Sequence, residues 1–444
     1  MTDERLKGRR LHFVGIGGAG MSGLALVAHA LGAEVSGSDK ADSPYCERLR
    51  AAGIEPVIGH DAANLPDGAE VVVSTAIPPD NAELAAARER GAALLHRGDL
   101  LGEVSRLKRS IAVAGTHGKT TTASMAAHVL LECGRDPGFL IGGELRSAGA
   151  NARWGAGEWV VVEADESDRS FLKLARDVAV VTNAELDHHA TYRSLGELEE
   201  VFDEFAAPAD ACVLGPDVEL PGARDAVTFG IGLGDLRAER VELLPLGSRF
   251  VVDGTEVELT VPGQHNVLNA LAALAACRFA GVEPGEAAPA LRSFSGAGRR
   301  FEDHGRTPSG ARVFDDYAHH PTEVAATLDA ARNLDPARLV ACFQPHLYSR
   351  TAKLAREFGR ALARADLPVV LDVYPARERP EDFPGVSGLL VARAAADAAG
   401  GKPVWWLPTL DEAERRLRGE LREDDVVVTL GAGNVDELAR RLTA

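Results

Sequence analysis

The segment from Ala112 to Thr122, with the sequence AVAGTHGKTTT, constrains the fold of this chain more than any other. It follows a β-branched run at 111–113 and precedes a helical pattern that stops at Gly134. A strand, a glycine loop, Lys-Thr and a helix, in that order, are typical of a phosphate-binding loop. Glycines let backbone N–H groups curl around an anion, and the helix N-terminus adds partial positive charge. The segment therefore predicts an α/β domain built around a bound phosphate.

The match is to the short pattern Gly115-x-x-Gly118-Lys119-Thr120, because Val113 stands where longer loops of this kind have another glycine. An ordinary glycine-rich turn between strand and helix is the alternative. Only seven of the 48 basic residues are lysines, so a lysine at this position favours a functional loop. Lys119 is expected to reach the terminal phosphates of ATP, and the Thr120 hydroxyl is expected to bind Mg²⁺.

Length and composition exclude several classes of protein. A chain of 444 residues, 45% hydrophobic, is expected to form two or three domains. No run of about 18 apolar residues predicts a membrane span, and the polar start of the chain does not resemble a signal peptide. Five scattered cysteines favour reduced thiols in the cytoplasm and argue against a zinc site. A net charge of −18 argues against a nucleic-acid partner.

Strands and helices alternate along the chain, which predicts largely parallel sheets flanked by helices. The charged stretch 97–110, interpreted as a loop, and the stretch 294–298 suggest domains at 1–106, 107–296 and 297–444. In the central domain we expect strands at 111–114, 159–163, 178–182 and 211–214, and an alternating pattern around Asp253-Gly254 predicts a hairpin, hence a mixed sheet. The polar clusters described next follow the carboxyl ends of strands, where open α/β sheets bind ligands.

Near the N-terminus, Gly15-x-Gly17-x-x-Gly20 with Asp39 further on fits the dinucleotide-binding fingerprint. The same geometry serves any pyrophosphate, so a nucleotide diphosphate is expected, with NAD or a purely structural turn as alternatives. Candidates for contacts to the sugar or base are Ser38, Asp39, His60 and Ser74, each of which could equally be a solvated loop residue.

Two polar clusters follow predicted buried strands of the central domain. In EADESD (163–168), four acids in six residues would repel one another unless a cation screens them, which favours a Mg²⁺ ligand, best placed at Glu163, over a solvated turn. In TNAELDHH (182–189), acids and two histidines suggest a metal or phosphate contact. Since Mg²⁺ prefers oxygen ligands, a histidine there suggests a second position that tolerates Mn²⁺.

Further candidates lie toward the C-terminus. Asn266 and Asn269 are three residues apart on one helix face and could pair with adenine, although capping explains such residues equally well. Arg300 lies at the second predicted linker, where a guanidinium could bind a phosphoryl group or simply face solvent. His320 and Arg350 could bind the carboxylate of an amino acid.

Eight strings in this order, spread over residues 10–440, together resemble the Mur ligase family: HFVGIGGAGMSG, GTHGKTTT, EADESD, TNAELDHH, GQHNVLN, GRRFE, DDYAHHPTE and FQPHLYSRT. The resemblance implies an N-terminal domain for a UDP sugar, a central ATPase and a C-terminal domain for an amino acid. It assigns the UDP-sugar site to Gly15, Gly17, Gly18, Ala19, Gly20, Met21, Ser22, Ser38, Asp39 and Ser74. It assigns the ATP site to Gly115, Thr116, His117, Gly118, Lys119, Thr120, Thr121, Asn266 and Asn269 (adenine), Arg300 (γ-phosphate) and Asp316 (ribose). It assigns the metals to Thr120, Glu163 and His188, the amino acid to His320, His346 and Arg350, and catalysis to Lys119, His188, Arg300 and His320.

The activity implied is ATP-dependent joining of L-alanine to the lactyl carboxylate of UDP-N-acetylmuramate through an acyl phosphate, a cytoplasmic step of peptidoglycan synthesis that supports cell shape and division. Mg²⁺, or Mn²⁺, would assist, with His188 or His320 as base and a monomer or homodimer as the working form. Many relatives carry Arg where this chain has Leu347, so Arg350 would act alone. Residues 189–207 lack the lysine that sister ligases carbamylate, which favours alanine as substrate. The alternatives are a recycling ligase that adds a whole peptide, an NAD-dependent dehydrogenase, and an ATP-driven switch.

Overall fold

The computed structural model describes residues 5–188 and 191–444. The chain divides into two compact units, each an α/β structure. Unit 1 comprises Met1–Arg237 and Asn269–Ala290, and unit 2 comprises Ala238–Leu268 and Leu291–Ala444. Three sheets support the predicted fold class, while the predicted boundaries after residues 106 and 296 stay an interpretation of the sequence.

The first sheet of unit 1 has five parallel strands in the order β3-β2-β1-β4-β5. They are β1 (Arg10–Val14), β2 (Glu34–Asp39), β3 (Val57–Ile58), β4 (Glu70–Val73) and β5 (Leu94–His96), with helices α1 (Ala19–Ala30), α2 (Pro44–Ala51), α3 (Ala82–Glu89) and α4 (Arg97–Ser105). Because the strand order reverses beside β1, the glycine loop that follows β1 lies at the switch point, where such sheets bind ligands.

Unit 1 also holds seven consecutive strands of a second sheet, in the order β12-β11-β10-β6-β9-β7-β8. They are β6 (Arg109–Ala114), β7 (Gly138–Leu145), β8 (Ala150–Arg153), β9 (Trp159–Glu163), β10 (Val178–Val181), β11 (Ala211–Leu214) and β12 (Val227–Ile231), with helices α5 (Lys119–Glu132) and α6 (Leu195–Ala206). Strand β6 pairs in parallel with β9 on one side and with β10 on the other. The ends of these three strands therefore lie next to one another.

Unit 2 contains the antiparallel strands β13 (Leu236–Leu244), β14 (Gly247–Val252) and β15 (Thr255–Leu259). The β14–β15 turn has positive φ at both Asp253 and Gly254, which confirms the predicted hairpin. Helices α7 (Gln264–Arg278) and α8 (Pro284–Ser293) follow along the chain, and the division into units falls within each of them.

The last sheet, also in unit 2, has the order β16-β17-β21-β18-β19-β20. Its strands are β16 (Glu302–Arg306), β17 (Arg312–Asp316), β18 (Arg338–Phe343), β19 (Leu367–Val370), β20 (Trp405–Trp406) and β21 (Asp425–Leu430), and its helices are α9 (Pro321–Arg332), α10 (Tyr348–Leu362), α11 (Gly388–Ala398), α12 (Leu410–Arg418) and α13 (Asp436–Thr443). Only β16 is antiparallel to its neighbour.

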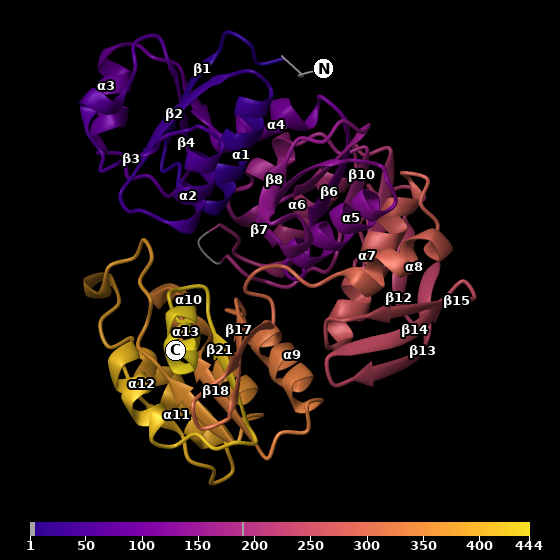
Figure 1. Ribbon diagram of the computed structural model, residues 1–444, viewed down its shortest axis with the longest axis vertical. Coiled ribbons are helices and arrows are strands. Elements are labelled where there is room, and N and C mark those ends of the chain that lie inside the picture. Colours follow the sequence, from indigo (N-terminus) through magenta and orange to yellow (C-terminus); the bar gives the residue numbers. More distant parts are fainter. Residues whose placement is uncertain (1–4, 189–190) are drawn as a thin grey trace. The chain divides into compact units, whose positions relative to one another are not determined.

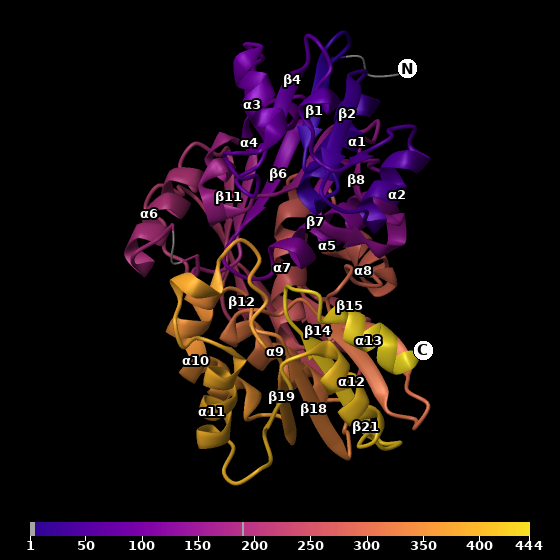
Figure 2. The ribbon, with the colours of Figure 1, turned by 90° about the vertical axis from the view of Figure 1, so that its left-hand side faces the viewer.

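One apolar core connects the two sheets of unit 1. It includes Leu24 and Val27 of α1 together with Leu140 of β7 and Ala152 of β8. Helix α1 accordingly lies beside β8 in both ribbon views (Figures 1 and 2). The glycine loop at the start of α1 is thereby held against the sheet that carries the phosphate loop.

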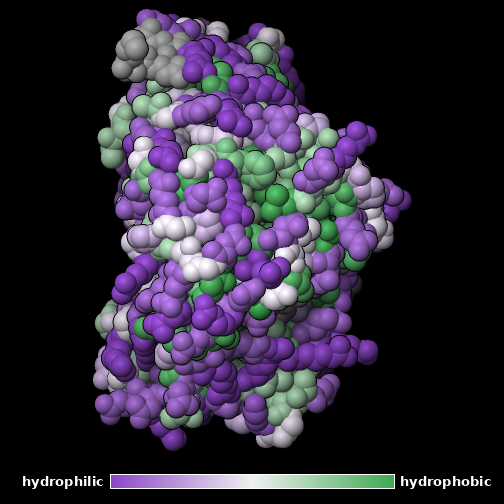
Figure 3. All heavy atoms as spheres, turned by 90° about the vertical axis from the view of Figure 1, so that its right-hand side faces the viewer, coloured by the Kyte–Doolittle hydropathy of each residue, from purple (hydrophilic) through white to green (hydrophobic). Residues whose placement is uncertain are grey.

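The interpretation of 97–110 as a loop was wrong for most of its length, because α4 occupies Arg97–Ser105. His96 and Asp99 form a reciprocal cap at its N-terminus, and Leu100 and Val104 are fully buried. Exposed charged residues such as Glu103 and Arg106 mask this short apolar stripe in the sequence. None of the helices in the described ranges combines the length and hydrophobicity of a membrane span. Hydrophilic side chains cover most of the face drawn in Figure 3.

Candidate active site

The glycine loop after β1 is tightly constrained by backbone geometry. Gly15 has φ +81°, and a Cβ on Gly17 would lie 2.7 Å from the Cys46 sulfur. Gly18 caps α1 without any side-chain hydrogen bond, and the first turn of the helix contains no acidic residue. Such a helix start, with its unsatisfied N–H groups, is suited to bind an anion.

The polar residues at the end of β2 hold this loop in place. A carboxylate oxygen of Asp39 accepts a hydrogen bond of 2.9 Å from the N–H of Gly17, and Ser38 accepts from the N–H groups of Gly15 and Ile16 through its carbonyl. The Ser38 hydroxyl is buried and donates to Glu83 at 2.7 Å. Ser74 follows β4 and is half-buried.

Glu83, which the sequence did not single out, is the centre of a buried network. Its side chain is fully buried and lies 3.0 Å from His12 Nε2 and 3.3 Å from His60 Nδ1, and it accepts 3.0 Å from Asn64 Nδ2. Burial alone would raise the pKa of Glu83, but the hydrogen bonds from His12, Ser38 and Asn64 outweigh it and lower the pKa to about 2. Glu83 lies in the first turn of α3, where acidic residues are common on the surface of a helix. The sequence therefore did not distinguish it from an exposed acid.

The phosphate loop lies between β6 and α5 as predicted, and two of its glycines are required by close contacts. Gly115 has φ +122°, and a Cβ there would lie 2.1 Å from the Thr182 hydroxyl. Gly118 has φ +81°, and a Cβ there would lie 2.3 Å from the amide oxygen of Asn269 on α7. Helix α5 is buried along almost its whole length, including Thr120 and Thr121.

Lys119 folds back onto its own loop. Its ammonium donates to the carbonyl oxygens of Gly115 (2.6 Å) and Thr116 (3.0 Å) and forms an ion pair of 2.9 Å with Glu166. Burial lowers the pKa of Lys119, but the negative charges of Glu166 and Asp165 prevail, so the pKa is raised and the side chain stays a cation.

The acidic cluster after β9 meets the loop at the shared edge of β6 and β9. The Thr120 hydroxyl donates to Glu163 at 3.0 Å, and Glu163 also accepts from the N–H of Gly142 at 2.7 Å. Asp165, Glu166 and His188 place potential metal-binding atoms within 4.8 Å of one another. Glu166 is 1% exposed, so a buried carboxylate, and not only Glu163, belongs to the site.

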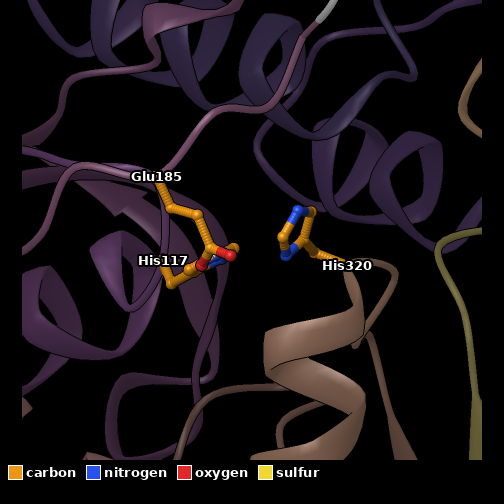
Figure 4. A group of neighbouring side chains, drawn as sticks. All are labelled: His117, Glu185 and His320. Carbon is orange, nitrogen blue, oxygen red and sulfur yellow. Dashed lines mark hydrogen bonds and ion pairs between the residues drawn. The ribbon is translucent and has the colours of Figure 1, made fainter. Parts of the chain in front are cut away.

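The segment after β10 holds the other side of the loop. Asn183 accepts 2.8 Å from the N–H of His117 and donates 2.9 Å to the His117 carbonyl. His117 Nε2 lies at hydrogen-bond distance, 2.9 Å, from a carboxylate oxygen of Glu185, and their side chains point at each other in Figure 4. His188 has φ +50° and lies 3.3 Å from Glu166. His189 lies outside the described residues.

The two predicted adenine contacts have different neighbours, although both lie on α7. Asn269 accepts a hydrogen bond of 3.3 Å from the Thr122 hydroxyl of α5. The side chain of Asn266 donates 2.7 Å to the carbonyl of Pro262, close to a capping contact. Asn269 is therefore in contact with the phosphate-loop helix within unit 1.

In unit 2, the two arginines at the end of the second predicted linker differ. Arg299 is bound to Asp315 (2.9 Å) and to two glycine carbonyls near the end of β21, so it holds the fold. Arg300 lies over the Tyr317 ring at 5.1 Å. Asp316 accepts from the N–H groups of Phe301 and Ala318, and burial raises its pKa to about 6.

The predicted amino-acid residues lie after β17 and β18. His320 caps α9, accepting 3.4 Å from the N–H of Thr322, and Figure 4 shows it at the start of that helix. The His346 ring stacks on the Tyr374 ring, with the ring centroids 5.9 Å apart. Nη1 of buried Arg350 lies 3.4 Å from Nδ1 of His346. Leu347 caps α10 with φ +71°, a rare conformation for a branched residue.

Three family models match successive parts of the chain. They are the Mur ligase family catalytic domain at 10–109, the Mur ligase middle domain at 113–277 and the Mur ligase glutamate ligase domain at 299–433. The UDP-N-acetylmuramate–L-alanine ligase of Rubrobacter xylanophilus is 46% identical, and the alignment covers 98% of this chain and 99% of that protein. The chain belongs to the Mur ligase family. The resemblance found in the sequence is thereby confirmed.

Other relatives agree with this membership. The Mur ligase named UDP-N-acetylmuramate–L-alanine ligase in Streptomyces coelicolor is 46% identical over 98% of this chain and 96% of its own. Among solved structures, the UDP-N-acetylmuramate–alanine ligase of Thermotoga maritima has a TM-score of 0.84 at 32% identity, covering 98% of each chain. A murein peptide ligase of Psychrobacter arcticus has a TM-score of 0.74 at 26% identity, again over 98% of each chain. This Mur ligase therefore has the predicted three-domain α/β fold.

Proposed function

We propose that this Mur ligase joins L-alanine to the lactyl carboxylate of UDP-N-acetylmuramate at the expense of ATP. The observation that carries the proposal is the likeness over 98% of the chain, at 46% identity, to relatives named UDP-N-acetylmuramate–L-alanine ligase. The site in unit 1 supports it, because a phosphate loop, a buried lysine and a set of carboxylates meet at one sheet edge. Since ATP and UDP sugars are cytoplasmic metabolites, the cytoplasm is the proposed location.

The chemistry follows from what amide formation requires. A carboxylate is a poor electrophile, so a carboxylate oxygen first attacks the γ-phosphorus of ATP and ADP leaves. The amine of alanine then attacks the carbonyl carbon of the acyl phosphate, and inorganic phosphate leaves with that oxygen. The amine proton passes to a base, for which His188 and His320 remain the candidates.

In unit 1, each proposed contact has a structural basis. The N–H groups at the start of α5 bind the phosphates, and Lys119 exchanges its present loop carbonyls for phosphate oxygens. The glycine loop at the start of α1 holds the diphosphate of the UDP sugar. Asn269 lies beside the phosphate-loop helix, where it supports the adenine assignment.

The residues of unit 2 keep the roles implied by their motifs. Asn266 would contact adenine, Arg300 the γ-phosphate and Asp316 the ribose. For the amino acid, buried Arg350 lies 3.4 Å from the half-buried His346, which stacks on Tyr374, a setting suited to bind a small carboxylate. His320 would complete that site.

Magnesium fits the donor atoms present at the edge of β9. The hydroxyl of Thr120 and the carboxylate of Glu163 are hard oxygen ligands 3.0 Å apart, as Mg²⁺ prefers. His188, with Glu166 and Asp165 beside it, fits a second ion that tolerates nitrogen, such as Mn²⁺. When bound, these ions would offset the negative charge of the phosphates. The chain's own part is to hold the carboxylates of Glu163 and Glu166 beside the phosphate loop.

The recycling ligase is the second candidate, because a murein peptide ligase shares the fold at 26% identity. The higher identity of the alanine ligases argues for free alanine. The dehydrogenase alternative loses its motivation with family membership, and Asp39, which would bind the ribose of NAD, instead holds the N–H of Gly17.

The test is phosphate release from ATP with UDP-N-acetylmuramate, Mg²⁺ and one acceptor at a time: alanine, glycine, serine or a murein tripeptide. We expect release to require the sugar nucleotide and to be fastest with alanine. Chelation of the metal should stop it. A preference for the tripeptide would replace this proposal with the recycling ligase, and release without any sugar nucleotide would favour an ATP-driven switch.

A further inference from the structure

A cavity of about 100 Å³ opens within unit 1 between the glycine loop and the acidic cluster. Its walls include Gly20 at the start of α1, Arg97 at the start of α4, and the carboxylates of Glu163 and Asp165. Among the described residues that line it, Arg97 is the only basic one. An anionic group that enters between these two carboxylates therefore has one cation available to it.

Two neighbours, Asp165 and Gly20, determine where the guanidinium of Arg97 lies in this cavity. It lies 3.2 Å from Asp165, with 24% of the arginine side chain and 39% of the aspartate side chain exposed. A Cβ on Gly20 would lie 2.7 Å from Arg97 Nη1, so the absence of a side chain at Gly20 is what lets the guanidinium reach the glycine loop. Arg97 thus connects the proposed diphosphate site with the proposed phosphoryl-transfer site.

We propose that Arg97 binds the lactyl carboxylate of the sugar nucleotide. The substrate carboxylate then replaces Asp165 as the hydrogen-bond partner of the guanidinium. The role rests on the proposed function. A guanidinium binds carboxylates through paired N–H donors, and the carboxylate of Asp165 already shows where such a group fits. A sugar nucleotide whose diphosphate lies at the glycine loop must carry its carboxylate toward Glu163, and the cavity is the path between them.

The replacement of Asp165 by the substrate carboxylate also reduces an electrostatic repulsion. A substrate carboxylate placed beside Glu163 and Asp165 would be repelled by both. Arg97 offsets that repulsion, and its paired N–H donors hold the carboxylate so that a remaining lone pair of one oxygen faces the phosphate loop. Arg97 acts on the substrate directly, so the account predicts an effect on sugar-nucleotide binding and little effect on ATP binding.

The experiment measures calorimetric binding of two sugar nucleotides to the intact chain without ATP. UDP-N-acetylmuramate carries the carboxylate, and UDP-N-acetylglucosamine has the same diphosphate and lacks it. Arg97→Ala should weaken the first by about tenfold or more, as expected for a lost charged hydrogen bond, and the second by less than about twofold. Arg97→Lys, which keeps the charge without the fork, should give an intermediate loss for the first only. Arg106→Ala, which removes an arginine at the other end of α4, is the control.

Equal weakening of both sugar nucleotides by Arg97→Ala, or unchanged binding of the first, would overturn this role. The thermal unfolding midpoint of each variant identifies a folding defect. If Arg97→Ala is misfolded, the binding of the two sugar nucleotides is compared in Arg97→Lys instead. A wild-type chain that binds neither sugar nucleotide and releases no phosphate would instead refute the proposed function, and the role of Arg97 with it.

Discussion

The ammonium of Lys119 contacts two loop carbonyls and Glu166, and a bound triphosphate would replace these groups as its partners. We predict that Lys119→Ala lowers phosphate release at least about a hundredfold, because a preorganised cation at the developing charge is lost. Lys353→Ala removes an exposed lysine of α10 and should leave the rate unchanged. Comparable rates in both variants would show that Lys119 has no part in phosphoryl transfer.

The network around Glu83 makes a prediction about acid stability. The pKa of Glu83 is about 2 in the fold, below its ordinary value of 4.5. A depressed pKa stabilises the fold fully above pH 4.5, and that contribution is lost as the pH falls toward 2. His12 and His60 face the carboxylate from β1 and from the loop after β3.

We therefore expect Glu83→Gln to lower the stability at neutral pH by roughly 1–3 kcal/mol and to flatten its decline in acid. Urea unfolding at a series of pH values measures both. Glu47→Gln, on the exposed face of α2, is the matched control and should match the wild type. An unaltered slope in Glu83→Gln would mean that other groups cause the acid decline.

At the scale of elements, the turn between β6 and α5 depends on contact with β10. An added methyl at Gly115 would collide with the Thr182 hydroxyl at 2.1 Å. Gly134, at the end of α5, also has positive φ but meets nothing within 4 Å. Both Gly→Ala changes should cost about 1 kcal/mol in backbone strain, but only Gly115→Ala should also reduce ATP affinity, by tenfold or more. Equal ATP affinities in the two variants would contradict a loop shaped by its fit against β10.

The elements that the sequence revealed are those with a strong period or a glycine signal, such as β6, β9 and α5. Strands β7 and β8 were missed because Gly138–Leu145 contains three glycines, and its buried and exposed positions do not alternate along the strand. Helix α4 was missed because its three charged residues, Arg97, Asp99 and Glu103, outnumber the two large apolar side chains that it fully buries, Leu100 and Val104. In each case, tertiary packing selects a structure that local propensity leaves open.

For the whole molecule, motif order predicted the fold class and most candidate residues, because each motif follows a strand and strand ends converge in a parallel sheet. Sequence reasoning could not predict which residues meet across that edge. The sequence placed Glu166 and Asn183 within candidate clusters without giving either a partner, and it gave Arg97 no role. Their contacts follow only from the packing of β6, β9, β10 and α4. Charge content alone could not distinguish them, since 26% of the chain is charged.

In the proposed reaction, ATP activates the sugar-nucleotide carboxylate before the amine attacks it. The most direct measurement uses UDP-N-acetylmuramate labelled with ¹⁸O in the lactyl carboxylate, followed by mass spectrometry of the released phosphate. We predict that one labelled oxygen appears in each phosphate, since that oxygen forms the bond to phosphorus and leaves with it. Phosphate free of label, alongside normal formation of the alanine product, would contradict the account.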